Sequence, residues 1–320
     1  MSKTKLSVVG AGAFGRNHCR VARECDRAEL VAVVDLDRAR AEEMVAVHGG
    51  VAMADARELA GKVDAAIVAV PTSAHEAVAC TLLESGIDVL VEKPIAVDAP
   101  AAGRIIDTAA RCGRVLQVGH LERFNPAVME LERRATLPLF FEIHRLNLFS
   151  PRSLDVDVVL DLMIHDVDIV LALAKAEPAE IRAAGISILS HKVDIANVRL
   201  QFPNGCVANL TASRVSTERV RKLRLFQPRQ YLSLDYARQD LAIFSVDSTR
   251  QIGFEQPPVK KEEPLKLELE AFLDAVENRT VTKCSGPAAR QTLRVALAIL
   301  DKIEEHSQLV SHTLTEGWKP

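Results

Sequence analysis

One lysine stands in a setting that favours chemistry. Lys93 lies between Glu92 and Pro94, directly after the apolar run 87–91. Proline confines the residue before it to extended backbone values, which would aim the Lys93 side chain reproducibly. An ammonium group held in this way can stabilise a developing alkoxide. The competing interpretation is an ordinary surface lysine at the end of a strand.

A second candidate lies in residues 157–175, where the pattern predicts a helix that is apolar nearly all round. The segment nevertheless carries four aspartates and a histidine: Asp157, Asp161, His165, Asp166 and Asp168. Buried charge is costly unless it is paired or functional. Asp161 and His165 share one helical face, and an imidazole oriented by a carboxylate can transfer protons near neutral pH. The alternatives are a satisfied interior polar cluster and an open metal site of Asp161, His165 and Asp168; we expect no metal.

A glycine-rich turn near the N-terminus has the spacing G-x-G-x-x-G. Gly10, Gly12 and Gly15 follow a short apolar run and precede a helical pattern. This arrangement presents backbone N–H groups and a helix dipole to a pyrophosphate, so it predicts a dinucleotide site, against a glycine turn with no ligand. The expected cofactor contacts are Gly10, Gly12, Ala13, Phe14, Gly15, Asp35, Arg38, Pro71, Thr72, His75, Glu92 and Lys93.

The residues after the next apolar run bear on the choice of cofactor. Asp35 ends the run 30–34, where an acidic side chain would accept hydrogen bonds from both ribose hydroxyls of NAD and repel a 2′-phosphate. Arg38 could offer a compensating positive charge. We expect NAD, with NADP less favoured.

The sequence of residues 1–121 predicts the fold that would position these candidate residues. Short apolar runs near residues 6–9, 30–34, 51–54, 64–70, 87–91 and 115–119 alternate with helical patterns. Such alternation is typical of a doubly wound parallel α/β sheet of the Rossmann type, whose ligands bind at the carboxyl ends of the strands. The turns that carry Gly10, Asp35, Pro71, Glu92 and Gly119 should therefore face one crevice.

From residue 122 to 320 the pattern predicts a second, α+β domain. Seven strands are expected at 140–148, 181–189, 193–202, 207–215, 220–226, 231–236 and 241–246, with helices at 157–175, 265–277 and 288–304. Strands in such close succession indicate a large, open, mainly antiparallel sheet. Helices should cover one face, and we expect the other to pack against a partner subunit in a homodimer or homotetramer.

Composition excludes several classes of partner. The chain has 320 residues and a formal net charge of -3, so no overall field favours nucleic acid. It contains no run of about 18 uncharged apolar residues and no signal-peptide pattern, which predicts a cytoplasmic protein without a membrane partner. The six cysteines form no C-x-x-C pair and are expected to be free thiols.

Four motifs together resemble the Gfo/Idh/MocA family of NAD(P)-dependent sugar and polyol oxidoreductases. They are GAGAFG at 10–15, EKP at 92–94, GHLERFNPA at 119–127 and DLMIHDVD at 161–168. The resemblance implies that Lys93 polarises the reacting hydroxyl, that His165 is the general acid/base, and that Asp161 holds the substrate or tunes its neighbours. It also implies that Arg123 and Asn125 line the substrate crevice, with Arg214 a further substrate contact.

Within that family, RFNPA and VVLDLMIHDVDIVL are most similar to members that oxidise the 3-hydroxyl of UDP-N-acetylglucosamine. The resemblance thus implies a dehydrogenase of a sugar or nucleotide sugar. Three alternatives stay open: a dehydrogenase of a free sugar or inositol, a glycosidase of the same family that cycles a bound NAD, and a non-catalytic dinucleotide sensor.

Overall fold

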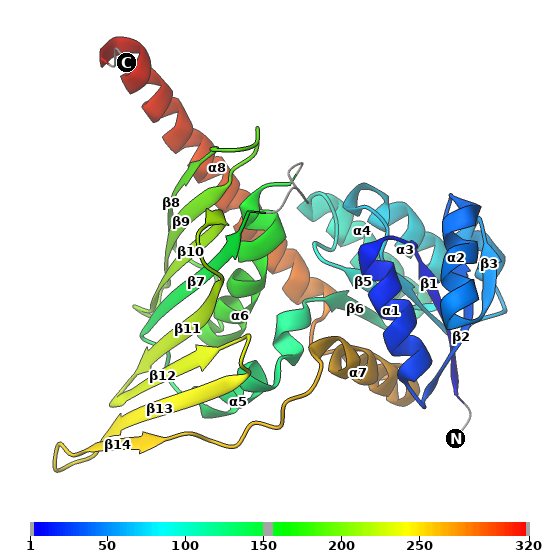
Figure 1. The fold of residues 1–320 in the computed structure, drawn as a ribbon, viewed down its shortest axis with the longest axis horizontal. Coiled ribbons are helices and arrows are strands. Elements are labelled where there is room, and N and C mark those ends of the chain that lie inside the picture. The colour runs from blue at the N-terminus through cyan, green and yellow to red at the C-terminus, as the bar shows by residue number, and fades with distance from the viewer. Residues whose placement is uncertain (1–2, 150–155, 318–320) are drawn as a thin grey trace. The chain divides into compact units, whose positions relative to one another are not determined.

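The structure is a computed structural model that describes residues 3–149 and 156–317 (Figure 1). The chain forms two compact units, one of residues 1–124 and 262–293 and the other of residues 125–261 and 294–320. The expected domains, 1–121 and 122–320, were continuous in sequence. Residues 262–293 depart from that division because Leu265, Leu269 and Phe272 join the apolar core of the first unit.

The first unit is built on a six-stranded parallel sheet, as the sequence predicted. Its strands are β1 (Thr4–Val9), β2 (Ala28–Val34), β3 (Val51–Met53), β4 (Ala65–Val68), β5 (Asp88–Glu92) and β6 (Leu116–Gly119), in the order β3-β2-β1-β4-β5-β6. Every residue of β4 and β5 is buried, which explains the apolar sequence AAIV of β4 and the apolar centre VLV of β5. The strand order reverses direction between β1 and β4, where sheets of this type bind their ligands.

Helices pack in two groups around this sheet. One group contains α1 (Ala13–Glu24), α2 (Arg38–His48) and α7 (Pro264–Asn278), and the other contains α3 (His75–Glu84) and α4 (Ala99–Cys112). Asp98 is the N-cap of α4, because its Oδ1 accepts a hydrogen bond of 2.7 Å from the backbone N–H of Ala101. Gly113 ends α4 in the left-handed conformation that glycine adopts readily.

The second unit is built on an eight-stranded mixed sheet. Its strands are β7 (Phe140–Leu148), β8 (Glu180–Ile186), β9 (Ile195–Gln201), β10 (Val207–Ser216), β11 (Val220–Gln227), β12 (Gln230–Asp235), β13 (Asp240–Val246) and β14 (Ile252–Glu255), in the order β14-β13-β12-β11-β7-β10-β9-β8. All seven expected strands are present. The sequence did not predict β14, a strand of four residues that is shorter than any of the seven expected strands.

Two features of this unit differ from the prediction. β7 pairs with β10 in parallel, whereas the other strand pairs of this sheet are antiparallel. β7 lies between two groups of strands that come later in the chain, β8–β10 on one side and β11–β14 on the other. A helix that we did not predict, α5 (Pro126–Arg134), begins after the N-cap Asn125. Proline in the first helical turn after an asparagine is a start signal that the sequence does contain.

The remaining helices of this unit cover one face of the sheet. The expected helix at 157–175 comprises a π-helical turn (Val159–Met163) followed by α6 (Ile164–Ala174), and the last helix is α8 (Gly286–Gly317), of which the part from residue 294 onward belongs to this unit. Side chains of α5, α6 and α8 share one core with alternate residues of β7 and β9–β13. None of the helices among the described residues combines the length and the hydropathy needed to cross a bilayer.

Candidate active site

The three motif glycines meet different requirements. At Gly10 the backbone φ is +106°, and an added Cβ would lie 2.5 Å from the carbonyl oxygen of Ala69. At Gly15 a Cβ would lie 1.8 Å from the carbonyl oxygen of Gly10. At Gly12 nothing lies within 4 Å of such a Cβ, so packing does not require glycine there. The open space at the start of α1 fits the close approach of a pyrophosphate.

The Asp35 carboxylate is held beside this turn. Its Oδ2 accepts a hydrogen bond of 2.7 Å from the backbone N–H of Ala11, and its Oδ1 accepts one of 2.9 Å from that of Asp37. Each carboxylate oxygen has a second lone pair with which it can accept from a ribose hydroxyl. Arg38 instead pairs with Glu42 at 3.0 Å on the exposed surface of α2. The residues therefore fit a dinucleotide whose ribose lies at Asp35.

Replacing Asp35 with alanine should narrow or reverse the preference for NAD over NADP. A hydrogen bond to a charged group contributes about 1.5–3 kcal/mol, so the ratio of kcat/KM values should change by about tenfold to a hundredfold. Asp37→Ala is the control, since Asp37 caps α2 from the same turn. An unchanged cofactor ratio in Asp35→Ala would show that Asp35 does not contact the ribose.

The turns after β4 and β5 carry the other residues expected at the cofactor. Pro71 is exposed, and Thr72 lies half-buried in a short 3-10 turn (Thr72–Ala74). His75 is buried, with Nδ1 2.9 Å from the carbonyl oxygen of Pro94 and Nε2 3.0 Å from that of Val70. Lys93 is half-buried, and its backbone N–H donates to Oε2 of Glu92 at 3.2 Å. His75 thus connects the two turns and has both ring nitrogens within reach of carbonyl oxygens.

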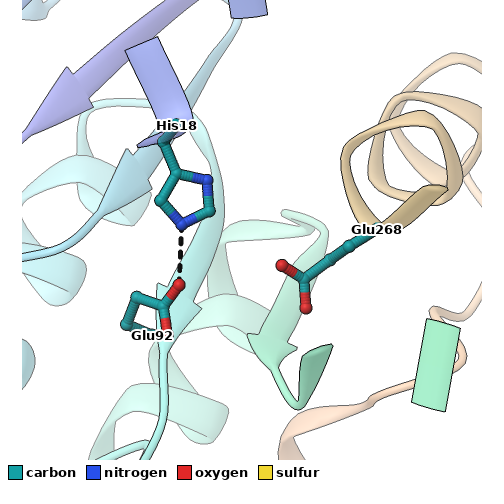
Figure 2. A group of neighbouring side chains, drawn as sticks. All are labelled: His18, Glu92 and Glu268. Atoms are coloured by element: carbon teal, nitrogen blue, oxygen red, sulfur yellow. Dashed lines mark hydrogen bonds and ion pairs between the residues drawn. The ribbon is translucent and has the colours of Figure 1, made fainter. Parts of the chain in front are cut away.

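Glu92 belongs to a buried cluster of three titratable side chains, His18, Glu92 and Glu268. Figure 2 shows the Glu268 side chain extending from α7 toward the other two. Nε2 of His18 lies 2.6 Å from Oε1 of Glu92, whereas two ligands of one tetrahedral ion, each about 2.1 Å from it, lie about 3.4 Å apart. The short contact is therefore a hydrogen bond and not the spacing of two metal ligands.

Sequence reasoning did not single out His18 or Glu268. Both interrupt apolar stripes at helical spacing: His18 lies between Gly15 and Cys19 on the buried face of α1, and Glu268 lies between Leu265 and Leu269 on that of α7. A charged residue within such a stripe is the signal that would have indicated them.

Glu268 is fully buried, and neither of its carboxylate oxygens has a hydrogen-bond partner among the described residues. Burial, and then the charge of Glu92, raise the pKa of the Glu268 carboxyl well above its ordinary value. A carboxyl whose pKa is raised on folding stabilises the folded state fully only below its unfolded pKa of about 4.3. That contribution is lost as the pH rises through the folded pKa.

Glu268→Gln should therefore gain thermal stability relative to the natural chain as the pH rises. The amide resembles the protonated acid in shape but does not titrate, so it avoids the growing cost of a buried negative charge. Melting temperatures of both proteins between pH 5 and pH 9 test this expectation. A difference that stayed constant with pH would contradict it.

The charged residues around α6 divide into two kinds. Oδ1 of Asp157 accepts from the backbone N–H of Val193 at 2.9 Å, and Asp166 is buried against Arg145 with two contacts of 2.7 Å. Asp166 is therefore a paired interior charge, and the half-buried Asp157 holds the backbone before β9. Asp161, in the π-helical turn, and His165, in α6, are both half-buried. π-helical turns occur often at functional sites, so the expected proton-transfer pair remains the candidate here.

Asn125 and Arg123, both expected at the substrate, lie at the start of α5 and in the 3-10 turn before it. Asn125 is buried: its Oδ1 accepts from the backbone N–H of Ala127 at 3.1 Å, and its Nδ2 donates to the carbonyl oxygen of Tyr236 at 3.1 Å. Arg123 is half-buried, and its carbonyl oxygen accepts from Nζ of Lys283 at 2.7 Å. The structure thus gives Asn125 a capping role.

Arg214, the third expected substrate contact, is buried on β10. Its guanidinium donates to the carbonyl oxygen of Val156, and its Nε lies 3.7 Å from Oδ1 of Asp194. Burial raises the pKa of Asp194, but hydrogen bonds from the backbone of Leu189, Ile188 and Ser190 lower it to about 2. Arg214 therefore lies against a carboxylate that is charged at neutral pH and that accepts backbone hydrogen bonds from the turn before β9.

Residues expected from the sequence fall into both units. The motif glycines, Asp35, His75, Glu92 and Lys93 lie in the first unit, at the carboxyl ends of β1, β2, β4 and β5 or in the turns that follow. Asp161, His165 and Arg214 lie in the second unit. The first group forms one edge of a parallel sheet, which is where a dinucleotide binds in folds of this type.

Comparison with known proteins agrees with this geometry. Residues 4–120 match the oxidoreductase family with an NAD-binding Rossmann fold, and residues 143–229 match the GFO/IDH/MocA C-terminal domain. UDP-N-acetylglucosamine 3-dehydrogenase from Acidithiobacillus ferrooxidans is 35% identical over 96% of this chain and all of its own length. Its crystal structure superposes with a TM-score of 0.90 over 96% of this chain and 99% of that one.

More distant relatives share the fold. Inositol 2-dehydrogenase from Rhizobium meliloti is 24% identical over 95% of this chain and 98% of its own length. An oxidoreductase from Agrobacterium radiobacter, whose structure contains NAD+, is 16% identical and superposes with a TM-score of 0.85 over 95% of this chain and 97% of its own. The resemblance and the fold class predicted from the sequence are confirmed, and the chain belongs to the Gfo/Idh/MocA family as an NAD(P)-dependent oxidoreductase that acts on CH–OH groups.

Proposed function

We propose that this protein is an NAD-dependent dehydrogenase that oxidises the 3-hydroxyl of UDP-N-acetylglucosamine. The observation that carries the proposal is the 35% identity to the enzyme of that name over essentially the whole length of both chains. A likeness of this extent covers the second unit as well as the first. The proposal therefore does not depend on the dinucleotide motif alone, which many chemistries share.

The residues of the first unit would hold the cofactor and the substrate oxygen. The glycine turn and the start of α1 receive the pyrophosphate, and Asp35 receives the adenosine ribose. When bound, the nicotinamide ring accepts the hydride released from the alcohol carbon. The ammonium group of Lys93 donates to the alcohol oxygen and stabilises the negative charge that develops there.

His165 would remove the proton of the same hydroxyl. A neutral imidazole is a suitable general base near pH 7, and the neighbouring Asp161 carboxylate orients it or holds the substrate. Arg123 is proposed to contact the sugar nucleotide from the 3-10 turn before α5. Asn125 and Arg214 donate hydrogen bonds to the backbone carbonyl oxygens of Tyr236 and Val156, so we propose that they support the substrate site by ordering the second unit.

A panel of UDP-sugars, free sugars and inositols, each assayed for NADH formation and for NADPH formation, tests the substrate directly. Activity should be greatest with UDP-N-acetylglucosamine and NAD. Activity restricted to free polyols would reject the nucleotide-sugar proposal.

A second candidate function is the oxidation of an inositol or free sugar. It is favoured by the full-length likeness to inositol 2-dehydrogenase, at 24% identity. The same panel separates it from the nucleotide-sugar dehydrogenase. Substrate conversion without accumulation of NADH would instead indicate a bound cofactor that cycles, and cofactor binding without turnover of any substrate would indicate a sensor.

We further propose that the face of the β7–β14 sheet opposite the helices pairs with a second copy of this chain. An aromatic ladder crosses it, formed by Phe140, Phe226, Tyr231, Phe244 and Phe254, which stand directly opposite one another on neighbouring strands. Successive ring centroids are 4.8 to 5.7 Å apart, and Phe254 is 62% exposed. Aromatic side chains gathered on an exposed face are typical of subunit interfaces.

Phe244→Asp should shift the protein from an oligomer to a smaller species. A charge in the middle of the aromatic ladder would have to be buried without a partner in the assembly. Light scattering coupled to gel filtration measures the mass, and Val47→Asp, on an exposed position of α2, is the control. An unchanged mass for Phe244→Asp would place the interface elsewhere.

A further inference from the structure

We propose that His18 and His75 are positioning residues that hold the backbone on the two sides of Lys93. The inference rests on the proposed role of Lys93 in the reaction. Neither histidine is exposed enough to meet a substrate, since His18 is 2% and His75 1% exposed. Each reaches Lys93 through the residue next to it, His18 through Glu92 and His75 through Pro94.

His18 acts on the N-terminal side of the lysine. Its Nε2 lies 2.6 Å from Oε1 of Glu92, and the other oxygen of that carboxylate accepts from the backbone N–H of Lys93 at 3.2 Å. A Cβ added at Gly119 would lie 3.0 Å from Oε2 of Glu92, so β6 leaves this carboxylate little room to move. The histidine on α1 therefore fixes a side chain that in turn holds the lysine backbone.

His75 acts on the C-terminal side. Burial lowers the pKa of its imidazole, so the neutral ring carries one N–H for two carbonyl oxygens, those of Pro94 and Val70. We assign the N–H to Nδ1, which lies 2.9 Å from the carbonyl oxygen of Pro94. This bond ties the residue after Lys93 to the first turn of α3.

The physical reason for two such contacts lies in the length of a lysine side chain. Four rotatable methylene groups place the ammonium far from its Cα, so small movements of the backbone become large movements of the charge. A displacement of about 1 Å at a reacting group can cost about a hundredfold in rate. Fixing the backbone on both sides keeps the ammonium within reach of the alcohol oxygen.

Side-chain amides can replace one imidazole nitrogen at a time. The amide of asparagine lies where Nδ1 of histidine lies, and that of glutamine approximates Nε2. His75→Asn should therefore keep most of the turnover, whereas His75→Gln should lower kcat by about tenfold to a hundredfold with little change in the affinity for NADH. His18→Gln should likewise retain turnover that His18→Leu loses. The assay uses UDP-N-acetylglucosamine and NAD, or the substrate that the sugar panel identifies.

Asp88→Asn is the matched control, because Asp88 is a buried, hydrogen-bonded residue at the opposite end of β5. It should destabilise the unit without the selective loss of kcat. In a Lys93→Ala background, His75→Gln and His18→Leu should cause no further loss of turnover, since their effect passes through the lysine. The proposal would be overturned if each histidine substitution lowered turnover by the same factor in the Lys93→Ala background as in the natural chain. It would also be overturned if His75→Gln retained activity and His75→Asn did not.

Hydrogen exchange of the Lys93 amide provides a measurement that does not depend on activity. His18→Leu should accelerate it at least tenfold, because Glu92 would no longer be held, and Asp88→Asn should not. Unchanged exchange in His18→Leu would overturn the inference even if Lys93 proves essential. Retained turnover in Lys93→Ala would instead reject the proposed role of Lys93, while leaving the exchange result interpretable.

Discussion

Lys93→Ala should lower kcat by about a hundredfold to a thousandfold, the range observed when a single donor to a developing oxyanion is removed. The loss should fall on kcat and kcat/KM alike, because the ammonium interacts most strongly with the charge that forms in the transition state. Binding of NADH, followed by its fluorescence, should be nearly unchanged, since the residues proposed to hold the pyrophosphate and the ribose are the glycine turn and Asp35 and not Lys93.

Two further variants sharpen this test. Lys93→Met keeps the aliphatic stem and removes only the charge, so it should be as slow as the alanine variant if the ammonium is what matters. Lys62→Ala, which removes an exposed lysine from the same unit, should have no effect. Turnover retained in both Lys93 variants would end the assignment of Lys93 to the oxyanion.

His165→Asn should lower kcat by about a hundredfold to ten-thousandfold, the usual contribution of a positioned general base. It should also remove one limb of the pH profile. A base must be neutral to accept the proton of the alcohol, so the natural enzyme should lose kcat/KM as the pH falls through the pKa of this imidazole, which is about 6.5 when unperturbed. The variant should show no such decline over the same range.

A profile of kcat/KM between pH 5.5 and pH 9 measures this effect. His191→Asn is the matched control, because His191 is an exposed histidine in the same unit. If the acid limb survived in His165→Asn, another group would be the base. Asp161→Asn should then be compared, since a carboxylate in the π-helical turn is the other titratable candidate on this segment.

Local sequence signals predicted most of the elements. The six strands of the first unit were predictable because each is a short apolar run that alternates with helical patterns along the chain, and the central strands β4 and β5 are buried throughout in a parallel sheet. Seven strands of the second unit were predictable from alternation, whereas β14 was not predicted, because it is only four residues long. The parallel pairing of β7 with β10 has no local signal, since it joins segments separated by a helix and two strands.

Some residues of the candidate site could be predicted from the sequence, and the contacts of others could not. The glycine turn and Asp35 follow from spacing alone, because the role proposed for them depends on the backbone of a single strand–helix–strand segment, β1–α1–β2. Asn125 was expected at the substrate, and the structure shows it capping α5 and bonded to Tyr236, a residue more than a hundred positions later. The sequence could not predict that the Asn125 side chain donates to the carbonyl oxygen of Tyr236, because only folding brings these two groups together.

The sequence by itself determined that Lys93 ends a strand of a dinucleotide-binding sheet, since apolar pattern, glycine spacing and the E-K-P motif are local properties. Tertiary structure alone decided what surrounds that lysine. His18 from α1, His75 from α3 and Glu268 from α7 converge on the end of β5 from positions up to 250 residues apart. Hydrogen bonds and burial depend on distance in space, so the buried cluster and the contacts on both sides of Lys93 became visible only in the folded chain.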